Sequence, residues 1–316
     1  MSTTTSRIAT WAEKLPTSVT PTVHRLAIAS LASQIGIIVT GGAVRLTKSG
    51  LGCSQWPNCV PGSMTPVPAS GIHGLIEFGN RMLTFVLVVI AIAMIASLWN
   101  MRRKHPVPFR LSIVLLGVIP IQAIIGGITV WTRLNPWVVS LHFLASAALV
   151  AAAALLVNRT GMLLRGGTTP AALPVTPTQS ALGWLIMATA SASVILGTIV
   201  TGTGPHAGAN SNDGLPAPRH DFDAYLVTRV HVVPVYLLVA ATVFALAYAI
   251  TKGAPKELRT GLWLLAGVVL LQGAIGYTQH FTGLPIGLVL AHMLCSALLV
   301  AAAFNVWDRS TGRFPA

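Results

Sequence analysis

Eight apolar runs, each long enough to cross a bilayer as a helix, constrain the fold of this chain more than any other feature. A transmembrane helix needs about 20 mostly apolar residues. The runs lie at roughly 25–44, 74–99, 111–131, 137–157, 180–201, 224–250, 260–280 and 285–307. Only 9% of all residues are charged, against about 25% in soluble domains. The sequence therefore predicts an all-α integral membrane protein with eight transmembrane helices.

Positive charges divide unequally between the two sets of loops that such a topology creates. Fourteen Lys and Arg residues fall on one side and four on the other. Cytoplasmic loops collect these residues, so we expect both termini in the cytoplasm and the chain in the cell membrane. The net charge of +13 has the same origin. The sequence contains no basic patch interleaved with aromatic residues, which is the pattern typical of nucleic-acid binding. The expected surroundings of the chain are therefore lipid.

One motif occurs twice along the chain. The first copy is Gln122–Gly126 followed by Leu141–Ala153, and the second is Gln272–Gly276 followed by Ala291–Ala303. Corresponding residues, such as His142 and His292, are 150 positions apart throughout. A constant offset over two helices indicates a duplicated unit. Because each half holds four spans, the halves share one orientation, which predicts two pseudo-symmetric four-helix bundles related as a parallel repeat.

The segment between the fourth and fifth spans is rich in Gly and Pro, as linkers are. We therefore expect a cytoplasmic segment at 1–23, an N-terminal bundle at 24–158, a cytoplasmic linker at 159–179, a C-terminal bundle at 180–307 and a cytoplasmic tail at 308–316. Small-residue faces at Ala151–Ala154 and Ala301–Ala303 allow close helix packing within or between chains. The sequence therefore leaves open whether the chain forms a homo-oligomer.

The first external loop contains two of the three cysteines, Cys53 and Cys59. Thiols on the outer face can be oxidised, so a disulfide between them is expected. Two alternatives stay open: a pair of free thiols, or a redox-active pair. Cys295 lies inside a span and is expected to pack there.

The second span begins with four polar residues that share one helical face: His73, Glu77, Asn80 and Arg81. A carboxylate at the edge of a membrane is costly unless it is paired or used. Glu77 is thus either the ion-pair partner of Arg81 or a functional group. Arg229 opens the sixth span 148 positions after Arg81. Both arginines lie at outer ends, against the positive-inside trend, which favours an anionic partner.

Four histidines lie toward the outer side by this topology: His73, His142, His231 and His292. A single His at a span end is most often an interfacial residue. Its occurrence in both copies of the repeat favours a ligand instead, because facing imidazoles in a helical bundle can hold a heme iron. Arg81 and Arg229 are then placed to receive the propionates. Zinc would require a tighter cluster of ligands.

The sequence resembles the heme A synthase family in its actinobacterial form, over roughly residues 24–307. The resemblance is carried by Gly41–Cys59, by the run Ile76–Arg81 and by the two histidine repeats. It implies two four-helix bundles, the first for the substrate heme O and the second for a heme b cofactor. The implied oxidoreductase reaction converts a methyl group of heme O to a formyl group, giving heme A for terminal oxidases.

Site residues follow from the resemblance position by position. Glu77 matches the family's functional glutamate, His142 the histidine of the first bundle, and His292 the heme ligand of the second. Cys53 and Cys59 match the external cysteine pair. Candidate partners are a heme O synthase, which would supply the substrate, and an electron carrier such as a quinone.

The chain departs from the family at the motif Glu-x-x-His-Arg, where Asn80 replaces the histidine. With Arg81 and Arg229 aligned, the same slot in the second half is Thr228, and His231 lies three residues further along. His231 could reach the same iron after a small shift. The first bundle either uses His73 or holds iron through His142 alone.

Three other functions compete with heme A synthesis. A diheme b-type, quinone-linked electron-transfer protein needs the same paired histidines but gives no reason for Glu77. A transporter would have discontinuous spans and bind no iron. A purely structural role as an oxidase assembly factor would be supported by loss of heme A while the heme sites of the protein stay intact. Extraction of the bound hemes and a search for the formyl product separates the first rival from the synthase.

Overall fold

The computed structural model describes residues 13–166, 175–206, 208 and 217–311, and within these ranges every named element of secondary structure is a helix. The long helices are α2 Pro21–Leu46, α3 Gly71–Leu98, α4 Pro106–Trp131, α5 Pro136–Gly166, α6 Pro177–Thr203, α7 Ala224–Thr251, α8 Lys256–Phe281 and α9 Ile286–Ser310. Two 3-10 turns, η1 Pro68–Ser70 and η2 Trp99–Met101, flank α3. Among the described residues, 8 helices are long and apolar enough to cross a membrane. The prediction of an all-α, multi-pass membrane protein is confirmed.

Several helices begin before the apolar runs do, at residues whose side chains cap the helix. The Thr20 hydroxyl accepts from the backbone N–H of Val23, and α2 then begins with a proline. Thr176 and Gln179 form a reciprocal capping box at the start of α6. A capping side chain satisfies backbone donors that the first turn leaves without partners. Hydropathy reports only the apolar part of a helix, so the predicted spans were too short.

The linker predicted at 159–179 is shorter than expected. Helix α5 continues to Gly166, and α6 begins at Pro177. Residues 167–174, in the middle of that segment, lie outside the described part. Helix α9 likewise continues through Asp308 to Ser310, into the predicted tail. Both helices extend because their polar ends find partners in each other, as shown below.

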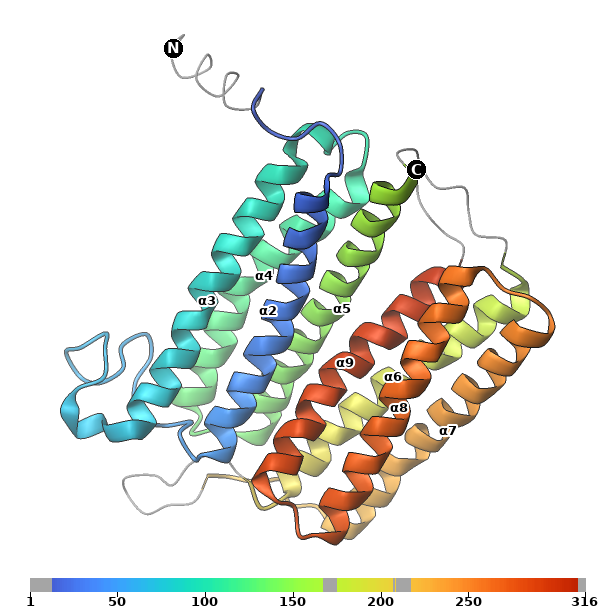
Figure 1. Ribbon diagram of the computed structural model, residues 1–316. Helices are drawn as coiled ribbons and strands as arrows, with labels where there is room; N and C mark the ends of the chain where they lie inside the picture. Colours follow the sequence, from blue (N-terminus) through green and yellow to red (C-terminus); the bar gives the residue numbers. More distant parts are fainter. Residues whose placement is uncertain (1–12, 167–174, 207, 209–216, 312–316) are drawn as a thin grey trace.

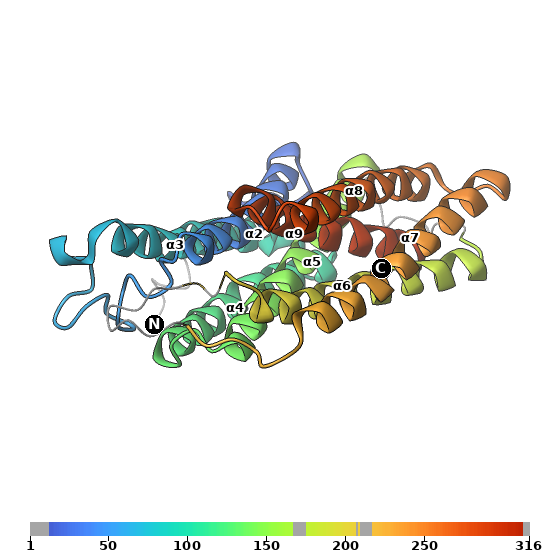
Figure 2. The ribbon, with the colours of Figure 1, turned by 90° about the horizontal axis from the view of Figure 1, so that it is seen from below.

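The helices form two groups, α2–α5 and α6–α9, which lie side by side (Figure 1). Helix α2 begins and α9 ends at the same end of the molecule. The opposite end carries the α2–α3 connection with Cys53 and Cys59, and is called the disulfide end here. Seen from below, α2, α5, α6 and α9 meet in the middle (Figure 2).

Small and branched side chains pack where the two groups meet. This cluster comprises Ile38, Ala147, Val150, Ala151, Val194, Ala297 and Val300. Alanines on α5 and α9 let the two backbones approach closely, as small residues do in membrane helices. The small-residue faces expected from the sequence therefore serve packing within the chain.

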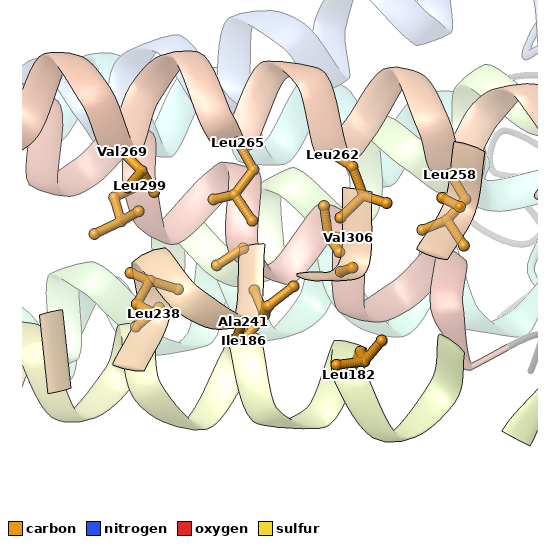
Figure 3. Packing of buried hydrophobic residues seen from close by; sticks show 14 residues of the cluster. Leu182, Ile186, Leu238, Ala241, Leu258, Leu262, Leu265, Val269, Leu299 and Val306 are labelled. Carbon is orange, nitrogen blue, oxygen red and sulfur yellow. The ribbon is translucent and has the colours of Figure 1, made fainter. Parts of the chain in front are cut away.

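Each group also has its own apolar core, in the half that faces away from the disulfide end. In the second group the core includes Leu182 and Ile186 of α6, Leu258 and Leu265 of α8, and Val306 of α9 (Figure 3). The core of the first group includes Val23, Met94, Leu98, Leu115 and Leu156. These residues come from the beginnings of the even-numbered helices and the later parts of the odd-numbered ones. The predicted histidines lie in the other half.

Candidate functional site

Three of the predicted histidines lie at similar depth, within two turns of a helix start at the disulfide end. Each lies six or seven residues after the first residue of its helix: His142 in α5, His231 in α7 and His292 in α9. At 1.5 Å per residue they lie about 10 Å along their helices. All three are half-buried, whereas His73, in the first turn of α3, is exposed.

Each of these three rings packs against a glycine of the preceding helix. A Cβ atom added to the glycine would lie 3.2–3.4 Å from the imidazole Cε1 atom, in the pairs Gly126–His142, Gly197–His231 and Gly276–His292. Glycine permits so close an approach of ring and backbone because it has no side chain. The repeated Gln-x-x-x-Gly motif thus supplies the surface on which its own copy's histidine rests.

In the second group, two imidazoles lie at similar depth on α7 and α9, those of His231 and His292. The Nε2 atom of Gln272 is 3.1 Å from Nε2 of His292. The Nδ1 atoms of both histidines are buried with no hydrogen-bond partner among the described residues. The structure therefore places the two residues predicted as ligands of the second heme at one level of the second group.

In the first group, the same glutamine makes different contacts. Gln122 donates to the Ser146 hydroxyl at 2.7 Å and to the backbone oxygen of His142 at 3.3 Å. Its Oε1 atom and the Nδ1 atom of His142 are buried without a partner among the described residues, as are the matching atoms of Gln272 and His292. Buried polar atoms seldom lack a partner unless a ligand or water supplies one.

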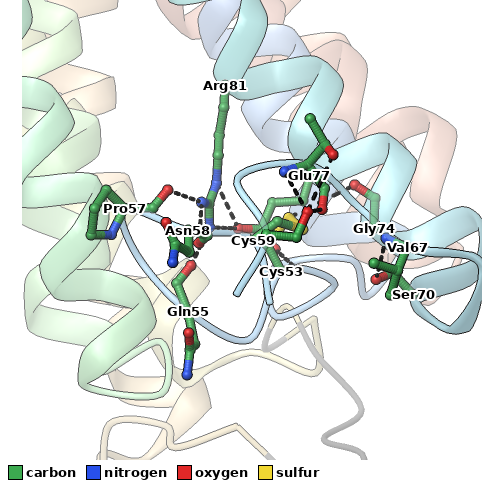
Figure 4. Close-up of a disulfide and its surroundings, with 12 residues drawn as sticks. Cys53, Gln55, Pro57, Asn58, Cys59, Val67, Ser70, Gly74, Glu77 and Arg81 are labelled. Atoms are coloured by element: carbon green, nitrogen blue, oxygen red, sulfur yellow. Dashed lines mark hydrogen bonds and ion pairs between the residues drawn. A yellow bond between two sulfur atoms is a disulfide. The ribbon is translucent and has the colours of Figure 1, made fainter. Parts of the chain in front are cut away.

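Glu77 is buried, with 6% of its surface exposed, and is held by three donors (Figure 4). Its Oε1 atom accepts from Arg81 Nη2 at 2.5 Å and from Arg81 Nε at 3.2 Å. Its Oε2 atom accepts from the backbone N–H of Cys53 at 2.8 Å. The ion pair that the sequence left as one interpretation of Glu77 therefore forms. The anionic partner of Arg81 is a residue of the chain itself.

The disulfide expected between Cys53 and Cys59 is confirmed, so the alternative of two free thiols is wrong. Cys295 is free and buried inside α9, as expected. Arg81 donates to the backbone oxygens of Asn58 at 3.1 Å and Gln55 at 3.1 Å, both within the loop that the disulfide closes. The loop, Arg81 and Glu77 therefore form one connected unit.

Trp56, in the same loop, is a site residue that the sequence analysis missed. Its ring occupies the space beside Gly127, where an added Cβ would lie 2.4 Å from the ring. The indole N–H of Trp131 donates to the backbone oxygen of Trp56 at 3.2 Å. Gly127 is the neighbour of Gly126, so the loop reaches the part of α4 that supports His142. An aromatic residue between two cysteines was the available signal.

The remaining candidates of the first group point to different places. The Thr40 hydroxyl donates to the amide oxygen of Asn80 at 2.7 Å, between α2 and α3. The Nδ1 atom of His73 is 2.9 Å from the Ser49 hydroxyl, at the loop. The structure thus places Asn80 between helices and His73 at the rim of the disulfide end.

Comparison with known proteins identifies the family. A family model described as "Cytochrome oxidase assembly protein" matches residues 24–304. The chain belongs to the heme A synthase family.

Several relatives bear the name heme A synthase. One from Shewanella oneidensis is 24% identical over 320 residues, which cover 87% of this chain and 94% of the relative. One from Geobacillus kaustophilus is 31% identical over 107 residues, only 34% of this chain and 32% of that relative. One from Lysinibacillus sphaericus is 32% identical over 140 residues, 41% of this chain and 42% of the relative. The alignment thus spans about a third of the length of the Geobacillus relative.

The contacts clarify where this heme A synthase family member departs from the motif. Asn80 and His231 are 151 positions apart, and His142 and His292 are 150 apart. Asn80 contacts α2 through Thr40, and His231 contacts α6 through Gly197, the first helix of each group. The contacts therefore favour matching His231 with Asn80, rather than Thr228 with Asn80 as the arginines suggested.

Arg229 differs from Arg81 in its surroundings. Arg229 is exposed, and its guanidinium lies 3.9 Å over the ring of Tyr225, a cation–π contact. Arg45, which the sequence analysis counted only as a loop charge, donates to the backbone oxygens of His206 at 2.7 Å and Thr201 at 2.9 Å. It therefore ties the two groups together at the disulfide end.

The donor set fits a heme better than a metal ion held by protein alone. Within the described ranges, no group of three or more His, Cys, Asp or Glu side chains could hold a metal. A porphyrin provides its own equatorial nitrogens and needs only axial ligands from the protein. His231 and His292 in the second group, and His142 in the first, have the ligand chemistry for that role, and each has a buried Nδ1 atom without a partner among the described residues.

Proposed function

We propose that this chain oxidises the methyl group of heme O to a formyl group and so makes heme A for terminal oxidases. The first group would bind heme O as substrate, and the second would hold heme b. One observation carries this proposal: a buried carboxylate, Glu77, is fixed at the disulfide end of the first group, whereas the buried carboxylate of the second group, Asp308, lies at the opposite end. At the 151-residue offset its counterpart is Thr228, whose hydroxyl donates to a backbone oxygen of its own helix.

The proposed architecture is a parallel repeat of two pseudo-symmetric four-helix bundles in the cell membrane, with both termini cytoplasmic. The constant offset of the motif and the unequal loop charges support it. The disulfide end would then face the outside, which agrees with an oxidised cysteine pair. The glutamine and histidine that correspond in the two groups carry the same unpartnered atoms.

His142 would bind the substrate heme, and His231 with His292 the heme b iron. The donors of Arg81 are engaged by Glu77 and by the loop. In our proposal Arg81 therefore acts on the substrate by positioning Glu77. Arg229 is exposed at the disulfide end and is the proposed partner of a propionate.

Glu77 has a defined chemical task in this proposal. Removal of electrons from a methyl group builds positive charge on its carbon. A preorganised carboxylate stabilises such a charge, and its oxygen can also accept the proton that leaves. With water as the source of the formyl oxygen, the conversion of the methyl group releases four electrons and four protons. When bound, heme b would supply one-electron transfer of these electrons to a membrane carrier, for example to two molecules of a quinone. The contacts from Arg81 and Cys53 keep the Glu77 carboxylate in one position.

The test is production of heme A by the purified full chain supplied with heme O. Extracted porphyrins are separated, and the formyl product is identified by mass and absorbance. We expect Glu77→Gln to lower the rate by roughly 100-fold or more while porphyrin stays bound. Glu257→Gln is the matched control, because Glu257 lies in the first turn of α8, at the end of the molecule opposite the disulfide. This variant should keep the normal rate.

Three outcomes would contradict the proposal. Glu77→Gln could make heme A at the normal rate, which removes the role of the carboxylate. The native chain could bind two hemes and form no formyl product, which favours a quinone-linked electron-transfer protein. A chain purified without any porphyrin would exclude both.

A further inference from the structure

We propose that the first group ligates the iron of its porphyrin through His142 alone and leaves the opposite axial position to a small exogenous ligand beside Asn80 and Thr40. The inference rests on the proposed function, because it needs a porphyrin in the first group. It would make the two sites chemically different: one closed by two imidazoles and one open.

The first step is the difference between two matching positions. In the second group, two imidazoles, those of His231 and His292, lie at similar depth on α7 and α9. In the first group, the counterpart of His231 is Asn80, at an offset within one residue of that of His142 and His292. Imidazole suits iron, whereas an amide carbonyl suits harder cations. Asn80 is therefore a poor replacement for the second axial ligand.

The second step is that the amide oxygen of Asn80 is already engaged. It lies 2.7 Å from the Thr40 hydroxyl, whose single hydrogen is also within reach of the backbone oxygens of Gly36 at 3.1 Å and Ile37 at 3.2 Å. The contact with Asn80 is the shortest of the three, and it orients the carboxamide so that the two Nδ2 hydrogens remain as donors. A half-buried amide donor can hydrogen-bond to a water or a diatomic ligand, but it cannot bind iron itself.

The third step concerns the space beside this pair. A Cβ added to Gly36 or Gly41, on either side of Thr40 in α2, would meet no atom within 4 Å. The segments Gly36–Gly41 and Gly197–Gly202 share glycines at both ends and a Val-Thr pair between them, at an offset of 161. In α6, the matching Gly197 is covered by the His231 ring. The first group has open space where the second has an imidazole.

The fourth step excludes the other histidines of the first group. His73 is exposed, and its Nδ1 atom is bonded to Ser49 at the rim. His24 is bonded to Thr160 near the start of α2, and His105 immediately precedes α4. Both lie at the end opposite the disulfide. Within the described parts of α2–α5, His142 is therefore the imidazole available to the site.

The experiment uses the purified full chain with both porphyrins bound, reduced and exposed to carbon monoxide. A heme with two imidazole ligands does not bind carbon monoxide, whereas a heme with an open position does. We expect carbon monoxide to bind to one of the two porphyrins. The oxidised protein should likewise show one high-spin and one low-spin heme by electron paramagnetic resonance.

Reciprocal substitutions assign the open site. Asn80→His should abolish binding of carbon monoxide with both porphyrins retained. His231→Asn should add a second binding site. Thr40→Val should keep binding but shift the carbon monoxide stretching frequency, because it releases the Asn80 amide. Thr201→Val, at the matching place in α6, should leave that frequency unchanged.

The outcomes separate the inference from the proposed function. If the native chain holds two porphyrins and neither binds carbon monoxide, the single-ligand site is wrong and heme A synthesis still stands. If the native chain binds carbon monoxide and His231→Asn gains no site, the assignment of the open position to the first group is overturned. If no porphyrin is present, the proposed function itself fails. If the Asn80→His variant loses its porphyrin, two other results decide whether the open position is in the first group. These are the number of carbon monoxide molecules bound per native chain and the gain or absence of a second site in His231→Asn.

Discussion

Asn158 donates a hydrogen bond to Asp308 at 3.4 Å, and the two residues are 150 positions apart, which is the offset of the repeated motif. Arg159 pairs with the other oxygen of Asp308 at 2.5 Å, and Arg309 donates to the Asn158 oxygen at 3.4 Å. Corresponding residues of the two copies therefore meet each other where the ends of α5 and α9 come together. This polar contact joins the two groups at the end opposite the disulfide.

Loss of the carboxylate at this contact should destabilise the protein. Asp308 is 2% exposed, and removing one member of a buried ion pair costs roughly 3–5 kcal/mol. We expect Asp308→Ala to lower the unfolding temperature in detergent, and Arg159→Met with Asp308→Ala to cost less than the sum of both. Asp221→Ala, at an exposed position, is the control. Unchanged unfolding of Asp308→Ala would contradict a structural role.

The glycines under the histidine rings should tolerate substitution unequally. Gly197→Ala would place a methyl group 3.3 Å from the His231 ring, whereas Gly36→Ala would meet nothing within 4 Å. Overpacking costs about 1–3 kcal/mol, and each 1.4 kcal/mol is about tenfold in affinity. We therefore expect Gly197→Ala to lose heme from the second site and Gly36→Ala to keep it. Heme absorbance per protein measures both, and equal loss in the two variants would contradict the geometry.

The disulfide should matter more for the reaction than for binding of porphyrin. Its loop provides the N–H that holds Glu77 and the carbonyls that hold Arg81. A disulfide that closes so short a loop contributes about 2 kcal/mol. We expect Cys53→Ser with Cys59→Ser to retain both hemes and to lower heme A formation, measured from extracted porphyrins. Cys295→Ala is the matched control. Normal product formation without the disulfide would refute this role.

His220 should make stability depend on pH. Its ring is buried against Trp137, 4.2 Å between ring centroids. Burial, and then the charge of Arg45, lower the pKa of His220 below its ordinary value near 6.5. The folded state then binds fewer protons than the unfolded state, so stability falls as pH drops below about 6.5.

The measurement is the unfolding temperature between about pH 7.5 and pH 5. We expect His220→Phe, which keeps an aromatic ring beside Trp137, to flatten the acid side of the profile. The native chain and the variant should behave alike above pH 7, where His220 carries no charge in either state. A variant as acid-sensitive as the native chain would exclude His220 as the cause.

The eight spans and the disulfide were within reach of sequence reasoning because their signals are local. The backbone N–H and C=O groups of a membrane-spanning segment must form hydrogen bonds within that segment, so the segment is helical. A long apolar run therefore predicts a membrane helix. Cys53 and Cys59 are near neighbours in one loop. Glu77 and Arg81 are four residues apart on one helix, which made their ion pair a stated alternative.

Other contacts had no such signal. Two contacts join segments that lie far apart in the chain. One is between Trp56 and Gly127, and the other is between Arg45 and the backbone of Thr201 and His206. The extension of α5 and α9 depends on charged ends that find each other across the two groups. Sequence alone left open whether His73 contributes to the first site or His142 holds the iron alone, because His73 and Asn80 lie on one face of α3.

The sequence by itself determined that eight apolar helices are long enough to cross a membrane, that one motif occurs twice at a constant offset, and that Glu77 has no carboxylate at the matching position. Only the tertiary structure decided which polar groups meet: Asn80 with Thr40, His73 with Ser49, and Gln272 with His292. The physical reason is that helix formation in a bilayer depends on local apolar length. The partner of a polar side chain depends instead on which helices pack together, and that is a property of the whole fold.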